Sequence, residues 1–148
     1  MTNKHSIFMN IAFEIAKNST CKRKQVGAVL VKEGRIISTG YNGTVKGAKH
    51  CNDLFKNYDK NDKEFFIEHG KWSGLNEIHA ELNAILWAAR HGIDTEGSVI
   101  YITLSTCINC AKAIIQAGVK EVYYSELYDR ETDGLDFLIK NKIKVTKI

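Results

Sequence analysis

Hydrophobic and polar positions along the chain predict helices and strands that alternate. Residues 4–18 carry hydrophobic side chains at helical spacing, whereas residues 26–32 and 35–39 are short hydrophobic stretches rich in β-branched residues. Glu33 and Gly34 separate these two stretches, which predicts a β-hairpin. Later in the chain the same patterns predict helices over residues 79–90, 107–117 and 133–141, and strands over residues 98–104, 121–125 and 142–147. This alternation predicts an α/β fold in which helices pack on the faces of a mixed sheet.

Two segments depart from this pattern. Residues 44–76 are polar and irregular, apart from a short helix expected around residues 62–69. A loop of this length in a compact domain is functional, tied by a metal or partly disordered, and Cys51 and His69 within it favour the metal. The helix over residues 79–90 is hydrophobic on nearly all sides, which indicates burial against both the sheet and a partner subunit.

Composition excludes several classes of protein. A chain of 148 residues with 44% hydrophobic and 26% charged residues is typical of one globular domain, here residues 1–148. We find no hydrophobic run long enough to cross a membrane and no signal-peptide core at the start, so we expect a cytoplasmic protein with no membrane partner. The net charge of +4 mildly favours an anionic ligand such as a phosphate, but it is too small to indicate a nucleic-acid partner.

Two short motifs concentrate the residues that can carry chemistry. His79 and Glu81 form an H-x-E motif, and Cys107 and Cys110 form a C-x-x-C motif; both open predicted helices. Together they match the zinc-deaminase signature, except that Thr106 stands where the signature has proline. Clustered thiols in a reducing compartment favour a metal over a disulfide. We therefore expect a zinc ion held by His79, Cys107 and Cys110, with Glu81 transferring protons beside it.

Helix geometry restricts how His79 can share a site with Glu81. Residues two apart in a helix point about 200° away from each other, so His79 must lie in the first turn or at the cap. Ser105 or Thr106 is expected to cap the helix that begins near Cys107. The alternative is a structural zinc site, but such sites use four protein ligands, and the nearest fourth candidate here is a glutamate at a spacing suited to catalysis.

A second set of candidate ligands consists of Cys21, Cys51, His69 and Glu77. Each one alone fits an ordinary structural role. Together they form a candidate closed zinc site that would order residues 44–76, because metal binding contributes directly to folding. Glu77 lies two residues before His79, so the two metals would be neighbours.

Three segments also carry a family resemblance: residues 35–43 (RIISTGYNG), 78–90 (IHAELNAILWAAR) and 101–113 (YITLSTCINCAKA). With the long Cys- and His-containing segment, they resemble the deoxycytidylate (dCMP) deaminases, above all those of the bacteriophage type, over residues 4–148. The resemblance implies a three-layer α/β/α cytidine-deaminase-like fold with a five-stranded mixed sheet. It also implies hydrolysis of dCMP to dUMP and ammonia, which supplies thymidylate synthesis.

The same resemblance implies roles for the candidate residues. His79, Cys107 and Cys110 match the catalytic zinc ligands, Glu81 matches the proton shuttle, and Cys21, Cys51, His69 and Glu77 match a second zinc site. Many members are hexamers that dCTP activates and dTTP inhibits, with Mg²⁺ accompanying the nucleotide. This regulation is associated with the motif formed here by Gly40, Tyr41, Asn42 and Gly43. We therefore expect a homo-oligomer, hexameric by resemblance, with dCTP and dTTP as effectors.

The candidate substrate contacts are Lys24, Asn42, Ser105 and Tyr128. Lys24 ends the basic run of residues 22–24, and we expect Lys24 and Tyr128 at the phosphate and Asn42 at the sugar. The glycines on either side of Asn42 predict a tight, exposed turn where φ can be positive.

Other functions compete with dCMP deamination. They are deamination of another nucleoside, of a base or of a tRNA adenosine; deamination of cytidine in a polynucleotide; a non-catalytic dNTP-sensing zinc module; and a structural zinc protein that binds nucleic acid. Glu81 argues against the non-catalytic module. The absence of a basic stripe argues against the tRNA and nucleic-acid alternatives, and the aromatic residues lie within hydrophobic patterns rather than along a groove. The catalytic motifs fit every deaminase, so the choice of dCMP depends on the residue 40–43 motif and the long segment.

Overall fold

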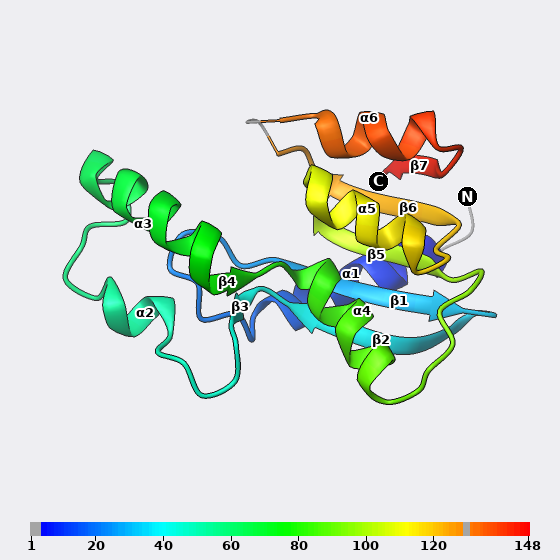
Figure 1. Cartoon of the computed structure of the whole chain (residues 1–148), viewed down its shortest axis with the longest axis horizontal. Helices are drawn as coiled ribbons and strands as arrows, with labels where there is room; N and C mark the ends of the chain where they lie inside the picture. The colour runs from blue at the N-terminus through cyan, green and yellow to red at the C-terminus, as the bar shows by residue number, and fades with distance from the viewer. Residues whose placement is uncertain (1–3, 129–130) are drawn as a thin grey trace.

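The computed structural model describes residues 4–128 and 131–148, and Figure 1 shows the arrangement of their helices and strands. The helices are α1 (Lys4–Ala16), α2 (Cys51–Leu54), α3 (Lys63–Asn76), α4 (Ala80–Arg90), α5 (Ile108–Gln116) and α6 (Asp133–Lys140). The strands are β1 (Gly27–Lys32), β2 (Arg35–Tyr41), β3 (Gly43–Thr44), β4 (Glu77–Ile78), β5 (Val99–Leu104), β6 (Glu121–Glu126) and β7 (Lys144–Lys147). No helix within the described ranges is long and hydrophobic enough to span a membrane.

Five strands form one mixed sheet in the order β2-β1-β5-β6-β7. Strand β1 pairs antiparallel with both β2 and β5, whereas β5, β6 and β7 run parallel. The β1–β2 hairpin turns at Glu33 and Gly34, whose φ angles of 52° and 76° suit a two-residue hairpin turn. These observations confirm the five-stranded mixed sheet expected from the sequence.

The sheet is buried on both faces, which makes three layers (Figure 1). Helices α4, α5 and α6 cover one face, and α1 covers the other. Successive residues of a strand point to opposite faces: Ala28 and Leu30 of β1 pack in the α4–α6 layer, and Val29 and Val31 pack in the α1 layer. The continuous hydrophobic run of β1 follows from burial on both sides.

Residues 44–76 are more ordered than their polar sequence predicts. They contain α2 and α3, which form a lobe beside the sandwich (Figure 1). The expected helix over residues 62–69 was too short, since α3 continues to Asn76. Asp62 caps α3 by accepting a hydrogen bond from the backbone N–H of Glu64. The lobe rejoins the sandwich through β4, which pairs with β3 in a two-stranded ribbon.

The residue 40–43 motif is not the exposed turn predicted from its glycines. Gly40 and Tyr41 end β2, Gly43 begins β3, and neither glycine has a positive φ. Gly40 is needed for a different reason: a Cβ atom there would lie 2.2 Å from the carbonyl oxygen of Ala80 and 2.5 Å from the backbone nitrogen of Ala84. The missing side chain therefore lets α4 approach β2 closely.

We expect Gly40→Ala to lower the free energy of unfolding by about 2–3 kcal/mol, because the new methyl group overlaps the α4 backbone and the helix must shift. Gly43→Ala is the matched control, since a Cβ atom at Gly43 meets no atom within 4 Å. Urea unfolding of both variants would measure the difference. Equal stability of the two variants would contradict the close-packing role of Gly40.

Candidate metal centre and active site

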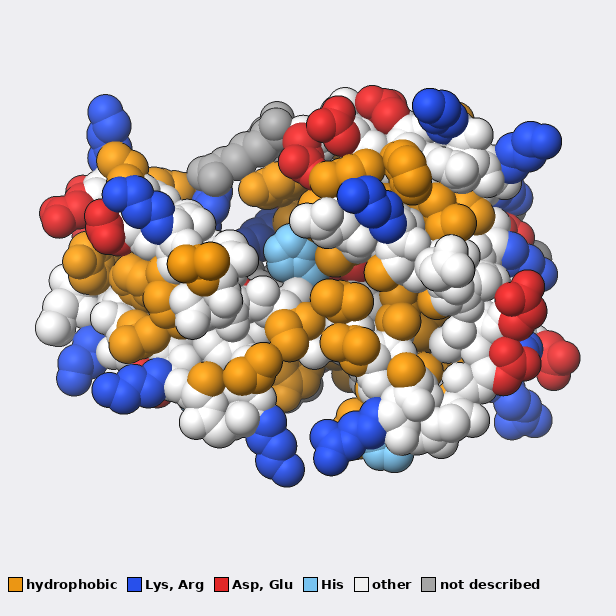
Figure 2. All heavy atoms as spheres, in the orientation of Figure 1, with side chains coloured by type: hydrophobic (Ala, Val, Ile, Leu, Met, Phe, Trp, Pro, Cys, Tyr) orange, Lys and Arg blue, Asp and Glu red, His pale blue; other side chains and the backbone are white. Residues whose placement is uncertain are grey.

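A cavity of about 660 Å³ lies where α4 and α5 begin and where β5 and β6 end. Its wall includes residues of the α3 lobe on one side and of the sandwich on the other. In Figure 2 the hollow is visible between these two parts, with a histidine side chain at its wall. The cavity contains both H-x-E residues, His79 and Glu81, and the first cysteine of the C-x-x-C motif, Cys107.

Two helix N-termini bring the first group of ligands together. His79 is the N-cap of α4 and Cys107 is the N-cap of α5, each with an extended backbone. The Nδ1 atom of His79 lies 3.4 Å from the Sγ atoms of both Cys107 and Cys110. All three side chains therefore point to one centre, and the Nδ1 nitrogen and the two sulfur atoms suit zinc. The cap position of His79 is the one that helix geometry required.

The cap of α5 differs from the expectation. Neither Ser105 nor Thr106 caps this helix; the sulfur of Cys107 accepts the hydrogen bond from the backbone N–H of Cys110. The hydroxyl of Ser105 instead accepts a hydrogen bond from the backbone N–H of Tyr128, at 2.7 Å. A ligand sulfur at a helix N-terminus is stabilised as a thiolate by the backbone N–H groups around it.

Coupling among these three side chains shifts their protonation. The hydrogen bond from Cys110 lowers the pKa of the Cys107 thiol to about 4, and the contact with Cys107 raises the pKa of His79 to about 9. The hydrogen bond between the two cysteines raises the pKa of Cys110. In the metal-free chain these shifts favour a Cys107 thiolate beside a protonated His79 imidazole. A metal ion would displace the protons of His79 and Cys110, since metal ligands must be deprotonated.

Glu81 lies beside the cluster but outside the group of mutually close ligand atoms. Its side chain is in the first turn of α4 and is 3% exposed. Burial raises the pKa of the Glu81 carboxyl. Its Oε1 atom accepts a hydrogen bond from the hydroxyl of Thr106, at 2.7 Å. A carboxyl whose pKa is shifted towards neutrality is suited to both accepting and donating a proton.

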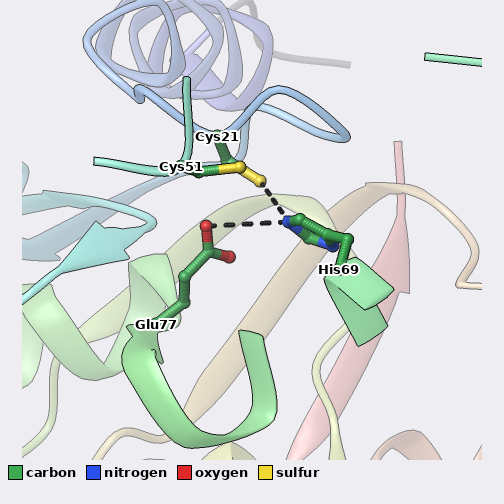
Figure 3. Close-up of side chains that lie close together, drawn as sticks. All are labelled: Cys21, Cys51, His69 and Glu77. Carbon is green, nitrogen blue, oxygen red and sulfur yellow. Dashed lines mark hydrogen bonds and ion pairs between the residues drawn. The ribbon is translucent and has the colours of Figure 1, made fainter. Parts of the chain in front are cut away.

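The second group of ligands also converges. Figure 3 shows Cys21, Cys51, His69 and Glu77 pointing toward one another, and their ligand atoms all lie within 4.8 Å of each other. The Nε2 atom of His69 lies 3.5 Å from the sulfur of Cys21 and 3.8 Å from Oε1 of Glu77. Burial raises the pKa of Glu77 to about 8.

This group fits a metal ion by its chemistry as well as its geometry. Oε1 of Glu77 is buried and accepts no hydrogen bond from any described residue, although buried carboxylate oxygens normally have such a partner. Around the ligands, Phe55, Phe65 and Trp72 form an apolar shell. Four protein ligands in an apolar surrounding suit a closed structural zinc site.

The candidate substrate contacts line the same cavity, but three of them have structural partners, and one of these is Ser105 with its hydrogen bond from Tyr128. Lys24 forms an ion pair with Glu126. Asn42 is buried rather than exposed: its amide donates to the carbonyl oxygen of Lys24 at 2.8 Å and accepts from the N–H of Val26 at 2.9 Å. Asn42 therefore fixes the approach to β1. Tyr128 lies at the cavity wall, and no hydrogen bond of its side chain to another described residue assigns its role.

The structure adds residues to the cavity wall beyond the candidate substrate contacts. Arg23, from the basic run of residues 22–24 considered for the phosphate, and Lys60, which no sequence pattern indicated, bring further positive charge there. Glu131 accepts a hydrogen bond from the backbone N–H of Ile108, at the start of α5. Lys22 lies elsewhere: its ammonium group donates to the carbonyl oxygens of Phe55 and Tyr58 in the lobe. Thr106 is a further site residue, through its contact with Glu81. The sequence gave one signal for it, because it stands before Cys107, where the deaminase signature has proline.

Comparisons with known proteins agree with this geometry. The family model for the cytidine and deoxycytidylate deaminase zinc-binding region matches residues 2–126. The deoxycytidylate deaminase of Enterobacteria phage T4 is 41% identical over 165 residues, which cover 93% of this chain and 86% of that protein. The deoxycytidylate deaminase of Mycobacterium phage D29 is 33% identical, with coverage of 79% and 90%.

Solved structures give the same result for the fold. The dCMP deaminase of cyanophage S-TIM5, in complex with dCMP and dUMP, superposes with a TM-score of 0.82 at 34% identity and covers 100% of this chain and 98% of that one. The same enzyme in its apo form gives a TM-score of 0.79 at 33% identity. Together with the His79, Cys107 and Cys110 cluster beside buried Glu81, these matches show that the chain belongs to the cytidine and deoxycytidylate deaminase family.

Proposed function

We propose that this protein catalyses the zinc-dependent hydrolysis of dCMP to dUMP and ammonia, and so supplies dUMP for thymidylate synthesis. The observation that carries the proposal is a His-Cys-Cys cluster with a buried carboxylate that is not a ligand, both at one cavity. Structural zinc sites have no need for such a carboxylate. The similarity to phage deoxycytidylate deaminases over most of both chains supports dCMP as the substrate.

The reaction needs one group that can both take and give a proton, and Glu81 fills that role. A zinc ion at His79, Cys107 and Cys110 would supply Lewis-acid chemistry at the position left open by three protein ligands. Glu81 takes a proton from the attacking water and passes it to N3 of the cytosine ring. It then takes the second water proton, from the hydroxyl group now on C4, and delivers it to the departing amino group. The water oxygen bonds to C4, the bond between C4 and the amino nitrogen breaks, and ammonia leaves. One dCMP and one water thus give one dUMP and one ammonia.

Glu81→Gln is expected to lower kcat for ammonia release from dCMP by about 10²–10⁴-fold, because the amide cannot exchange protons. Metal analysis should find the same zinc content in the variant as in the wild type, since Glu81 is not among the ligands. Parallel assays with deoxycytidine, cytidine and dCTP separate dCMP deamination from its alternatives. Turnover of dCMP by Glu81→Gln at the wild-type rate would refute this mechanism.

For the substrate phosphate, we propose Lys24 and Tyr128, with Asn42 and Ser105 lining the rest of the nucleotide site. Lys24 is about half exposed at the cavity wall, so its ammonium group is accessible to a phosphate. Its partner Glu126 would hold the lysine in place before the substrate arrives. Arg23 and Lys60 add to the positive potential at the same wall.

We expect Lys24→Ala to raise KM for dCMP about tenfold or more, which is the loss of one charge-assisted hydrogen bond. Any deamination of deoxycytidine, which has no phosphate, should keep its rate. Lys17→Ala is the control, because Lys17 is an exposed lysine just after α1 that pairs with Glu14 and does not line the cavity. An unchanged KM for dCMP in Lys24→Ala would remove Lys24 from the phosphate site.

We further propose that Cys21, Cys51, His69 and Glu77 bind a second, structural zinc ion. The site joins residues before β1, in α2, in α3 and in β4, so an ion there would attach the lobe to the sandwich. Its closed ligand set and apolar shell support a structural rather than a catalytic role.

Cys51→Ser should cause loss of one bound zinc ion on metal analysis, and the segment between β3 and β4 should become more sensitive to proteases, because the ion no longer ties it down. His50→Ser is the matched control at the neighbouring position, where the imidazole contacts Thr20 instead of the cluster. If Cys51→Ser retained its full zinc content, the second site would be ruled out.

We also propose that dCTP and dTTP, with Mg²⁺, regulate the enzyme at a site that includes Gly40, Tyr41, Asn42 and Gly43. The protein would act as a homo-oligomer, hexameric by its resemblance to the family. Leu86 and Trp87 of α4 support an interface with a second copy, because these large hydrophobic side chains are 46% and 54% exposed. A dCMP deamination rate that does not respond to either nucleotide would refute the regulation. A monomeric mass at micromolar concentration would refute the interface.

A further inference from the structure

Thr106 occupies the position immediately before Cys107, where the zinc-deaminase signature has proline. Proline has no hydroxyl group and cannot donate a hydrogen bond from its side chain. Thr106 is 1% exposed, and its hydroxyl lies 2.7 Å from Oε1 of Glu81. This chain therefore has a contact to the proton-transferring carboxyl that a signature proline would not provide.

The hydroxyl of Thr106 has one other hydrogen-bond acceptor nearby among the described residues. The second acceptor within reach is the carbonyl oxygen of Cys107, at the longer distance of 3.4 Å. Capping of α5, the usual role of a threonine before a helix, is performed by the Cys107 sulfur. A hydroxyl carries one proton, and the short distance assigns that proton to Glu81.

The backbone that carries Thr106 is firmly held. The preceding residue, Ser105, donates its N–H to the carbonyl oxygen of Glu126 at 2.8 Å and accepts from the N–H of Tyr128. On the other side, the backbone of α6 packs so closely that a Cβ atom at Gly134 would lie 2.1 Å from the carbonyl oxygen of Thr106. A donor on such a fixed segment can restrain the carboxyl that it contacts.

We propose that Thr106 is a positioning residue for the deamination: its hydroxyl holds Oε1 of Glu81 and thereby orients the carboxyl, leaving the other oxygen for proton exchange with water and substrate. The inference rests on the proposed function, because it assigns Glu81 to proton transfer. Thr106 acts through Glu81 and need not touch the substrate. Orientation of a proton-transfer group contributes to the rate and much less to substrate binding.

Thr106→Val keeps the shape of the side chain and removes the hydroxyl. We expect kcat for dCMP to fall about tenfold with KM changed less than twofold and zinc content unchanged. Thr106→Ser, which restores a hydroxyl, should recover most of the lost kcat. Thr103→Val is the matched structural control, because it removes another buried threonine hydroxyl, one that accepts from the N–H of Gly27 and lies outside the active site; its kcat should equal that of the wild type.

A crystal structure of zinc-loaded Thr106→Val gives a readout that does not depend on activity. The Glu81 carboxyl should rotate or occupy two orientations in the variant and one in the wild type. An unchanged single orientation, or a Thr106→Val kcat equal to that of Thr103→Val, would overturn the positioning role. Wild-type protein that released no ammonia from dCMP would refute the proposed function instead, and the crystallographic comparison would still decide the role of Thr106.

Discussion

The convergence of two helix N-termini is the constraint on which the active site depends. His79 and Cys107 cap α4 and α5, and a cap residue leaves the helical path, so its side chain can point away from its own helix toward the other. Both helices pack on the same face of the sheet, which fixes the distance between their starting points. Gly40 contributes at a distance, because its lack of a side chain sets how closely α4 approaches β2. A shift of either helix by one residue would separate the ligand atoms.

The short segment from Glu77 to Glu81 connects the proposed parts of the enzyme. Glu77 and His79 are extended, so these alternate residues can serve two neighbouring ligand groups, and Glu81 follows in the first helical turn. Strand β3 pairs with this segment, with Gly43 opposite Ile78 and Thr44 opposite Glu77. The proposed effector motif, which ends at Gly43, is thus paired with β4. Strand β4 carries Glu77 of the second ligand group, and His79 of the first group follows directly after it. A movement of Gly43 and Thr44 would therefore be transmitted through the β3–β4 pairing to Glu77 and Ile78, and from there to His79.

Much of the fold could be predicted from the sequence, because its signals are local. The hydrophobic run of β1 and the helical spacing in α1 indicate their elements without reference to the rest of the chain. Local sequence signals mislead where a contact with a distant part of the chain determines the structure. Gly40 resembles a turn glycine in the sequence, but it is required because the α4 backbone packs against it. Helix α3 is longer than predicted, because its polar sequence has little helical periodicity.

For the site, the sequence by itself determined which residue types carry the chemistry: spacing within each motif is a local property, and H-x-E with C-x-x-C is specific enough to indicate a deaminase centre. Only the tertiary structure decided how these residues meet. It brought Cys21, Cys51, His69 and Glu77 from four separate segments to one point, and it gave the cap of α5 to Cys107, which left the hydroxyl of Thr106 for Glu81. Such contacts join residues far apart in the chain, and their distances depend on the packing of helices against the sheet, which no local pattern contains.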